Sequence, residues 1–243
     1  MSAWDTYRAR LNVHGNTMRE AAKRMEIRRL QDKLPTNLSY TDVAINDNPQ
    51  SVIIIDTTDL SEKKIRSMPG ETLVHGGLVS WEESKWLITE LDAHKELYYS
   101  GLIKRCNQVV KWVTPEGDII SRWGIVEDGT KYLVGENVKQ VATLGDARMA
   151  LTLAKDSATR RLHTGTRIML GDPEADQRLA FEITKPNTLY NVYNGEGVYR
   201  FILTQVPLID EDNLTEQVAD ADGRGFKDPV VTPEEIRETG VYL

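Results

Sequence analysis

The segment IKRCNQVVKWVTPEGDIISRWGIVEDG, residues 103–129, decides the fold class of this chain. Its first half contains NQVVKWV, which is rich in the β-branched and aromatic residues that favour strands. This stretch leads into TPEG, where Pro115 and Gly117 suit the second and fourth positions of a type I turn. DIISRWGIV then has the composition of a returning partner strand. The segment predicts a β-hairpin, with Trp112 and Trp123 facing each other across the strands or lying diagonally.

Similar strand and turn units lie on both sides of this hairpin. SVIII at 51–55 and KWLITELD at 85–92 have strand patterns, EDGTKYLV contains an Asp-Gly turn, and TLYNVYNGEGVYRFIL contains an Asn-Gly turn. Strand signals at spacings of about 8–12 residues, separated by Gly, Pro, Asn and Asp, are typical of all-β domains. We therefore predict a mainly β fold in which residues 50–208 form one antiparallel β-barrel or sandwich, with turns at 114–117, 127–130 and 193–197.

The aromatic residues of this region are the candidate core. Four of the five tryptophans fall between Trp81 and Trp123, in a chain with only three phenylalanines. Large aromatic side chains on strands supply buried area, and a lone cysteine is usually a small buried residue. An exposed aromatic platform for a ligand is the alternative interpretation. The predicted structural core contains Trp86, Cys106, Trp112 and Trp123.

The first 34 residues are predicted to form a basic amphipathic helical arm. Apolar residues recur on one helical face, at Trp4, Tyr7, Leu11, Met18 and Met25. The helix is expected to end at KLPTN, because Pro35 disfavours the helical conformation of Leu34 and cannot donate a backbone hydrogen bond. Residues 35–49 are then predicted to be a linker.

The charge is distributed unevenly along the chain, whose formal net charge is −7. Residues 1–34 contain eight Lys and Arg against four Asp and Glu, whereas residues 209–243 contain three against ten. A basic arm is suited to contact nucleic acid or an acidic protein, and an acidic tail is suited to a basic surface. Two solvated ends without partners are the alternative. We predict that residues 209–243 form an extended acidic tail, and that an assembly interface includes Trp4, Tyr7, Leu11, Met18, Arg24, Met25, Arg28, Arg29, Asp210, Glu211 and Asp212.

Residue patterns for catalysis are scarce. The four histidines show no pair at the spacing that would present two imidazoles to one metal ion. His-Gly-Gly at 75–77 resembles an oxyanion-hole loop, but the sequence has neither a Gly-X-Ser-X-Gly motif nor a glycine-rich phosphate loop. The acidic clusters at 171–176 and 209–213 do not match a calcium-binding loop, and we interpret them as solvated turns. We therefore expect a protein that is not an enzyme, without catalytic, cofactor-binding or metal-binding residues.

The sequence shows no signal for a membrane or for secretion. No apolar run approaches the roughly 18 residues that span a bilayer, and MSAWDTYRAR lacks the apolar core of a signal peptide. The single cysteine cannot form an intrachain disulfide. We expect an intracellular protein, or one assembled inside a cell, with no membrane contact.

Several segments together resemble a known group of phage proteins. They are Trp-Leu-Ile-Thr-Glu at 86–90, Cys-Asn at 106–107, Lys-Trp at 111–112, Gly-Thr-Arg-Ile at 165–168 and Ile-Thr-Lys at 183–185. This succession is similar to virion structural proteins of the head–tail connector type, from tailed phages that infect Gram-positive bacteria. The resemblance implies a ring-forming homo-oligomer of the virion, assembled in the host cytoplasm, that contacts portal, capsid or tail components.

Two other functions stay open. One is a nucleic-acid-binding β-barrel module, and the basic arm makes packaged DNA a candidate partner in either case. The other is a hydrolase whose Asp and His residues meet only in space. The first alternative is easily distinguished, because binding to phosphates weakens steeply with salt.

Overall fold

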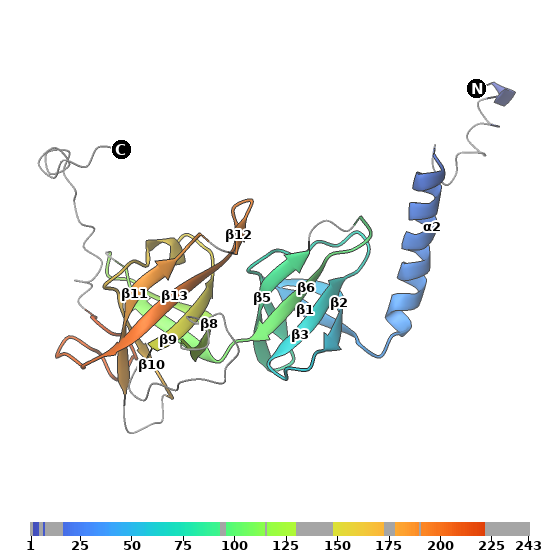
Figure 1. Ribbon diagram of the computed structural model, residues 1–243. Helices are drawn as coiled ribbons and strands as arrows, with labels where there is room; N and C mark the ends of the chain where they lie inside the picture. Colours follow the sequence, from blue (N-terminus) through green and yellow to red (C-terminus); the bar gives the residue numbers. More distant parts are fainter. Residues whose placement is uncertain are drawn as a thin grey trace, which may run out of the picture. The chain divides into compact units, whose positions relative to one another are not determined.

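The computed structural model of the 243-residue chain describes residues 2–4, 7, 17–92, 96–114, 116–129, 148–172, 178–189 and 191–221. These residues form a mainly β protein with antiparallel, barrel-like sheets and an N-terminal helix (Figure 1). The predicted fold class is therefore confirmed. The chain divides into two compact units, of which unit 1 comprises Met1–Cys106 and Leu189–Val198, and unit 2 comprises Asn107–Thr188 and Tyr199–Leu243.

Unit 1 contains a closed antiparallel barrel. Its strands are β1 (Tyr40–Ile45), β2 (Asn48–Asp56), β3 (Glu62–Ser67), β4 (Leu78–Trp81), β5 (Ser84–Asp92) and β6 (Ser100–Arg105). They follow the order β1-β2-β3-β6-β5-β4, and β1 also pairs with β4 through Ala44 opposite Ser80 and Ile45 opposite Val79. This last pairing closes the barrel, so its strands present no open edge.

Side chains that alternate along the strands fill the interior of this barrel. Because successive residues of a strand point to opposite faces, every second residue can reach the core. Trp86 lies in the core and packs against Trp81, with their ring centroids 5.7 Å apart. The buried cluster consists of Val43, Ile45, Val52, Ile54, Ile65, Leu73, Val79, Trp86, Ile88 and Ile103.

The segment 35–49, predicted to be a linker, contains part of this barrel. A two-residue turn at Asn46-Asp47 joins β1 to β2, and its positive φ angles of 48° and 65° are typical of a type I′ turn. The Asn46 side-chain oxygen also accepts a hydrogen bond from the backbone N–H of Leu78, at 2.9 Å. The prediction failed because Val43 and Ile45 form too short an alternating pattern to outweigh the polar residues around them.

The helix α2 (Met18–Lys33) begins and ends at local signals in the sequence. Thr17 caps its first turn by accepting a hydrogen bond from the backbone N–H of Glu20, and Thr-X-X-Glu is the capping-box pattern. The helix gives way at its C-terminus to the 3₁₀ turn η1 (Leu34–Thr36), in which Pro35 lies. The predicted helix end is confirmed.

Unit 2 contains the second β-sheet. Its strands are β7 (Gln108–Val113), β8 (Ile119–Asp128), β9 (Arg148–Ala154), β10 (Arg167–Leu170), β11 (Leu179–Asn187) and β13 (Glu196–Val206), in the order β10-β11-β13-β9-β8-β7. The 3₁₀ turn η2 (Thr159–Arg161) lies between β9 and β10. The short strand β12 (Val192–Tyr193) pairs with the beginning of β13, and these residues are counted with unit 1.

The hairpin of residues 103–129 is confirmed as the β7–β8 pair. Gly117 N–H donates to the carbonyl oxygen of Thr114 at 2.9 Å, as the predicted turn requires. The two tryptophans do not face each other, because Trp112 pairs with Ile120 and Trp123 pairs with Val109. Trp112 is 1% exposed, whereas Trp123 is 38% exposed on the opposite face. The assignment of Trp123 to the core is therefore wrong.

The other predicted turns have different outcomes. Asn194-Gly195 joins β12 to β13 as a two-residue turn, with φ angles of 52° and 89°, so the turn at 193–197 is confirmed. β8 continues to Asp128, and the end of the turn at 127–130, like the TKYLV segment after it, lies outside the described residues. Most of the acidic cluster at 171–176 lies outside them as well.

The division into two units replaces the predicted single domain at 50–208. Cys106 N–H donates to Lys85 in unit 1, at 2.8 Å, and Asn107 N–H donates to Gly124 in unit 2, at 3.1 Å. One peptide bond therefore separates residues that bond to different sheets. Sequence spacing cannot reveal such a boundary, because the last strand of one sheet and the first strand of the next follow each other as closely as hairpin strands do.

Candidate assembly surfaces

The helix α2 exposes much of its surface. None of its residues is buried, and Met18 and Met25 are 90% and 62% exposed. Trp4 and Tyr7, which are 60% and 52% exposed, stack on each other with ring centroids 5.4 Å apart. Leu11, the remaining apolar residue of the predicted stripe, lies outside the described residues. An isolated helix of this length is marginal in water, so α2 is an element suited to packing on another surface.

The surface of α2 is basic. Met18–Lys33 contains six Lys and Arg against three Asp and Glu, a net charge of +3. Arg29 pairs with Glu26 within the helix at 2.6 Å, and Lys23 pairs with Glu96 at 3.8 Å. Arg19 forms an ion pair with Glu96 as well. The predicted interface residues Arg24, Arg28 and Arg29 are exposed.

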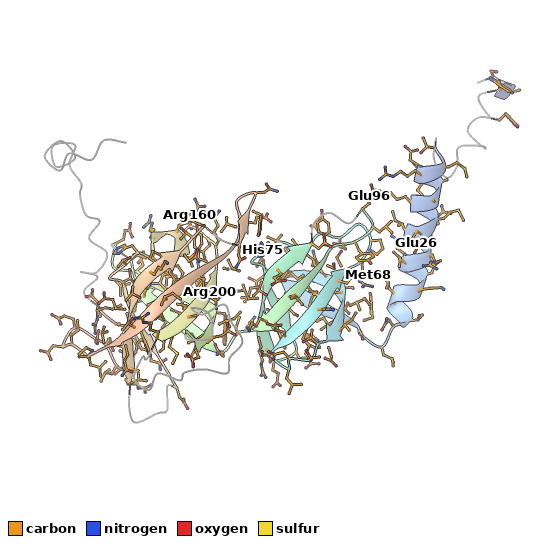
Figure 2. The ribbon with its side chains drawn as sticks, in the orientation of Figure 1. Glu26, Met68, His75, Glu96, Arg160 and Arg200 are labelled. Carbon is orange, nitrogen blue, oxygen red and sulfur yellow. The ribbon has the colours of Figure 1, made fainter. Side chains whose placement is uncertain are left out.

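A groove lies beside α2, between the helix and the segment before β6. Its volume is about 470 Å³, and Glu26 and Glu96 mark its two walls in Figure 2. The Tyr98 ring contacts the Arg66 guanidinium, whose carbon lies 4.6 Å from the ring centroid. The lining residues are Arg19, Ala22, Lys23, Glu26, Glu96, Leu97 and Tyr98. Acidic and basic groups balance in this lining, so the groove itself has no preference for ligand charge.

Residues 207–221, here called the seam segment, are folded rather than extended. They connect the two ends of the strand order of unit 2, because Lys111 of β7 donates to the Glu216 carbonyl at 2.8 Å and Arg167 of β10 donates to the Pro207 carbonyl at 2.8 Å. Val218 and Ala219 are buried. The prediction of an extended tail is therefore wrong for residues 209–221, and residues 222–243 lie outside the described part.

Asp212 holds the seam segment in place. Its carboxylate accepts hydrogen bonds from Arg167 at 2.8 Å and from the backbone N–H groups of Ile209 and Asp220, both at 2.9 Å. Burial of the carboxyl alone would raise its pKa, but the two amides and the guanidinium outweigh burial and hold the pKa below its ordinary value. The Asp212 side chain is fully buried, so its predicted place on an assembly interface is corrected.

The outer side of the seam segment is acidic. Residues 207–221 contain five Asp and Glu and no Lys or Arg. Asp210 and Glu216 are exposed, while Glu211 is half-buried. Apolar side chains accompany these carboxylates, and the most exposed are Leu208, Ile209 and Leu214.

The other predicted core residues lie inside the protein. Trp86 is 5% exposed and Cys106 is 7% exposed. Burial raises the pKa of the Cys106 thiol to about 12, so the reactive thiolate is scarce at neutral pH.

His75 and the glycines after it have a structural role that we did not predict from the sequence. His75 Nε2 lies 2.9 Å from the Thr89 carbonyl oxygen, and the imidazole stacks on Tyr193, with ring centroids 5.7 Å apart. Gly76 allows close approach of the same hairpin, because a Cβ at this position would lie 2.0 Å from the Gly197 carbonyl oxygen. The stretch at 75–77 therefore receives the β12–β13 hairpin. The signal in the sequence was the pair of adjacent glycines, which mark close backbone approach.

One further hollow, in unit 2, carries polar groups. Its volume is about 310 Å³, and Glu116 and Arg161 form an exposed ion pair at 3.0 Å in its lining. Among the residues that the structure describes, no group of three His, Cys, Asp or Glu is placed to hold a metal ion. Nor does any helix in that part of the chain have the length and apolar character to cross a membrane.

Comparisons with known proteins give one family match. Residues 13–105 match the family model described as the YomX N-terminal domain. The name of this family derives from a phage of the Bacillus type. This range takes in α2 and the barrel of unit 1, and the match indicates a phage-associated protein. A comparison with curated protein sequences finds no match.

Two of the solved structures that resemble the chain are of MrkH from K. pneumonia. The apo structure has 11% sequence identity and a TM-score of 0.25, and the alignment covers 80% of this chain and 88% of that one. The complex with c-di-GMP has 12% identity and a TM-score of 0.23, and covers 80% and 90%. At these TM-scores the likeness carries no argument about this chain.

Proposed function

We propose that this chain is a non-enzymatic structural protein of a tailed-phage virion, a subunit of the head–tail connector or neck ring. The observation that carries the proposal is α2, a well-capped helix whose 16 residues are all at least partly exposed. A folded element of this kind, with Met18 and Met25 exposed beside a basic surface, is suited to burial against a neighbouring subunit.

Two further observations support this proposal. The phage-derived family match includes α2, so the exposed helix is part of the matched region. The strand and turn motifs between roughly residues 70 and 205 resemble virion proteins of the connector type. In the proposed ring the partners are other copies of the chain and a portal, capsid or tail component, and the location is the virion.

The direct test is a protein inventory of purified virions by mass spectrometry. We expect this chain at a constant ratio to the portal and major tail proteins, and rings of the purified chain in negative-stain microscopy. Absence from intact, infectious virions would contradict the proposal. A non-structural phage protein expressed at a similar level in the same infected cells serves as the control for carry-over.

A DNA-binding role is the second candidate, because of the basic charge of α2. Its test is a titration of the purified chain with fluorescent duplex DNA at several salt concentrations. If affinity falls steeply with salt while virions lack the protein, the nucleic-acid-binding module is favoured.

A further inference from the structure

Two described surfaces of this chain have opposite charge. The helix α2 has a net charge of +3, and the seam segment contains five carboxylates and no cation. Asp212 is paired internally with Arg167, whereas Asp210 and Glu216 are exposed at the surface of the seam segment. Surfaces of opposite charge steer association and fix its register.

Both surfaces also carry apolar side chains at exposed positions. On α2 these are Met18 and Met25, at 90% and 62% exposure, and on the seam segment they are Leu208, Ile209 and Leu214, at 41–45%. Charged rims around apolar contacts are the usual anatomy of a protein interface.

The seam segment is held in a fixed conformation, which favours its use as a receptor surface. The Asp212 carboxylate ties together the amides of Ile209 and Asp220, and an isolated β-bridge pairs Asn213 with Val218. A surface that is already ordered loses less conformational entropy on binding.

We propose that α2 of one copy docks on the seam segment of a second copy. This inference rests on the proposed function and names the contact through which the subunits associate. The contact joins two different surfaces of the same chain, so it is head-to-tail, and repeated contacts of this kind generate a ring when the rotation closes. The apolar side chains supply the buried area, and the charges select the partner surface.

The experiment reverses the charge on each surface in the full-length chain. One variant carries Arg24→Glu and Arg28→Glu on α2, and the other carries Asp210→Lys and Glu216→Lys on the seam segment. The controls, Arg160→Glu and Glu83→Lys, make the same kind of change at exposed positions elsewhere. Sedimentation velocity over a range of protein concentrations measures self-association, and circular dichroism with thermal melting checks that each variant is folded.

We expect each double variant to associate at least about tenfold more weakly than the wild type, because the α2 variant reverses the net charge of the helix and the seam variant removes most of the negative charge of the segment. Mixing the two double variants should restore association, since the seam variant keeps the wild-type α2 and the α2 variant keeps the wild-type seam segment, so a mixed pair can form the original contact between opposite charges. Raising the salt from about 50 mM to about 500 mM should weaken wild-type association, and the two controls should behave as the wild type does.

Three results would overturn the inference. They are a wild-type chain that is monomeric at every concentration, variants that associate normally, and a loss of association that mixing does not restore. The outcome is separable from the proposed function, because the virion inventory does not depend on which surfaces meet. If the chain is found in virions but the variants associate as the wild type does, the virion role stands and this contact is refuted.

Discussion

Asp212→Asn should release the seam segment from unit 2. The wild-type carboxylate accepts one hydrogen bond from Arg167 and two from backbone amides, and its side chain is fully buried. Asparagine keeps one acceptor oxygen, but its amide NH₂ must face a guanidinium or a backbone N–H, which are donors as well. Arg167, whose side chain is 13% exposed, would lose its counter-charge.

The expected cost follows from this geometry. Removing one partner of a buried ion pair costs about 3–5 kcal/mol, mainly because the other charge stays buried and uncompensated. Arg167 keeps its hydrogen bond to the Pro207 carbonyl, so we expect about 3 kcal/mol, the lower end of that range. The matched control is Asp210→Asn, which removes an equal charge from an exposed position in the same segment. Its effect should stay within about 0.5 kcal/mol.

Hydrogen exchange read by mass spectrometry is the suitable assay, because it reports opening of residues 207–221 and of β10 separately from unit 1. Asp212→Asn should accelerate hydrogen exchange in residues 207–221 and in β10, and leave exchange in the unit 1 barrel unchanged. The reasoning is refuted if Asp212→Asn and Asp210→Asn exchange alike.

The contribution of Asp212 should also depend on pH. The pKa of this carboxyl is lowered in the folded protein, so the stabilisation is fully present above the unfolded-state pKa of about 3.9. It is lost as the pH falls through the folded-state pKa, which is lower. Wild type and Asp212→Asn should therefore converge in strongly acidic solution, and a difference that persists there would contradict an ionic origin.

Three other predictions test separate parts of the fold. Trp112→Ala should destabilise unit 2 by roughly 3–5 kcal/mol in denaturant titrations. Trp123→Ala, on the exposed face, should cost less than about 1 kcal/mol. Equal costs would place both rings in one core. Gly76→Ala should increase hydrogen exchange in residues 191–197, because the alanine Cβ would meet the Gly197 carbonyl. Gly70→Ala, at a position with a similar positive φ but open space, should not. Equal effects would assign the result to backbone strain alone. Cys106, with a pKa raised to about 12 by burial, should resist iodoacetamide at pH 8 in the native protein and react after unfolding, and rapid native alkylation would contradict its buried position.

Local signals allowed the helix and the hairpins to be predicted from the sequence. The helix α2 ended beside Pro35 as expected, although Leu34 keeps helical angles (φ −62°, ψ −38°), and Asn194-Gly195 formed the expected tight turn. Predictions that depended on residues far apart in the sequence were less successful. The site residues on α2 lie on an exposed surface, whereas Asp212 is buried by a contact with Arg167, 45 positions away.

The error at Trp123 shows how one residue in a loop decides which side chains share a face. If Thr114 paired with Gly117 as the last pair of the hairpin, Trp112 would pair with Ile119. Trp123 lies four residues after Ile119, so both tryptophans would then lie on the same face of the sheet. The structure instead pairs Val113 with Ile119, which places Asp118 in the loop. This single residue shifts the register, and a shift by one moves every side chain of the strand to the other face. Sequence composition identifies the turn but not its length, so the hairpin was predictable and the direction of Trp123 was not.

The seam segment shows a second limit of sequence reasoning, this time for charge. Five carboxylates without a cation within residues 207–221 are typical of a solvated stretch, and no local pattern contradicts that interpretation. The segment is held in place because Lys111 on β7 and Arg167 on β10 donate hydrogen bonds to its carbonyl oxygens. The Asp212 carboxylate takes part in that anchoring, whereas Asp210 and Glu216 are exposed. The acidic residues of this segment therefore have two roles, an internal ion pair at Asp212 and an exposed negative surface. The net charge counts every carboxylate alike, so the ordered segment and its negative surface have to be inferred together from the fold.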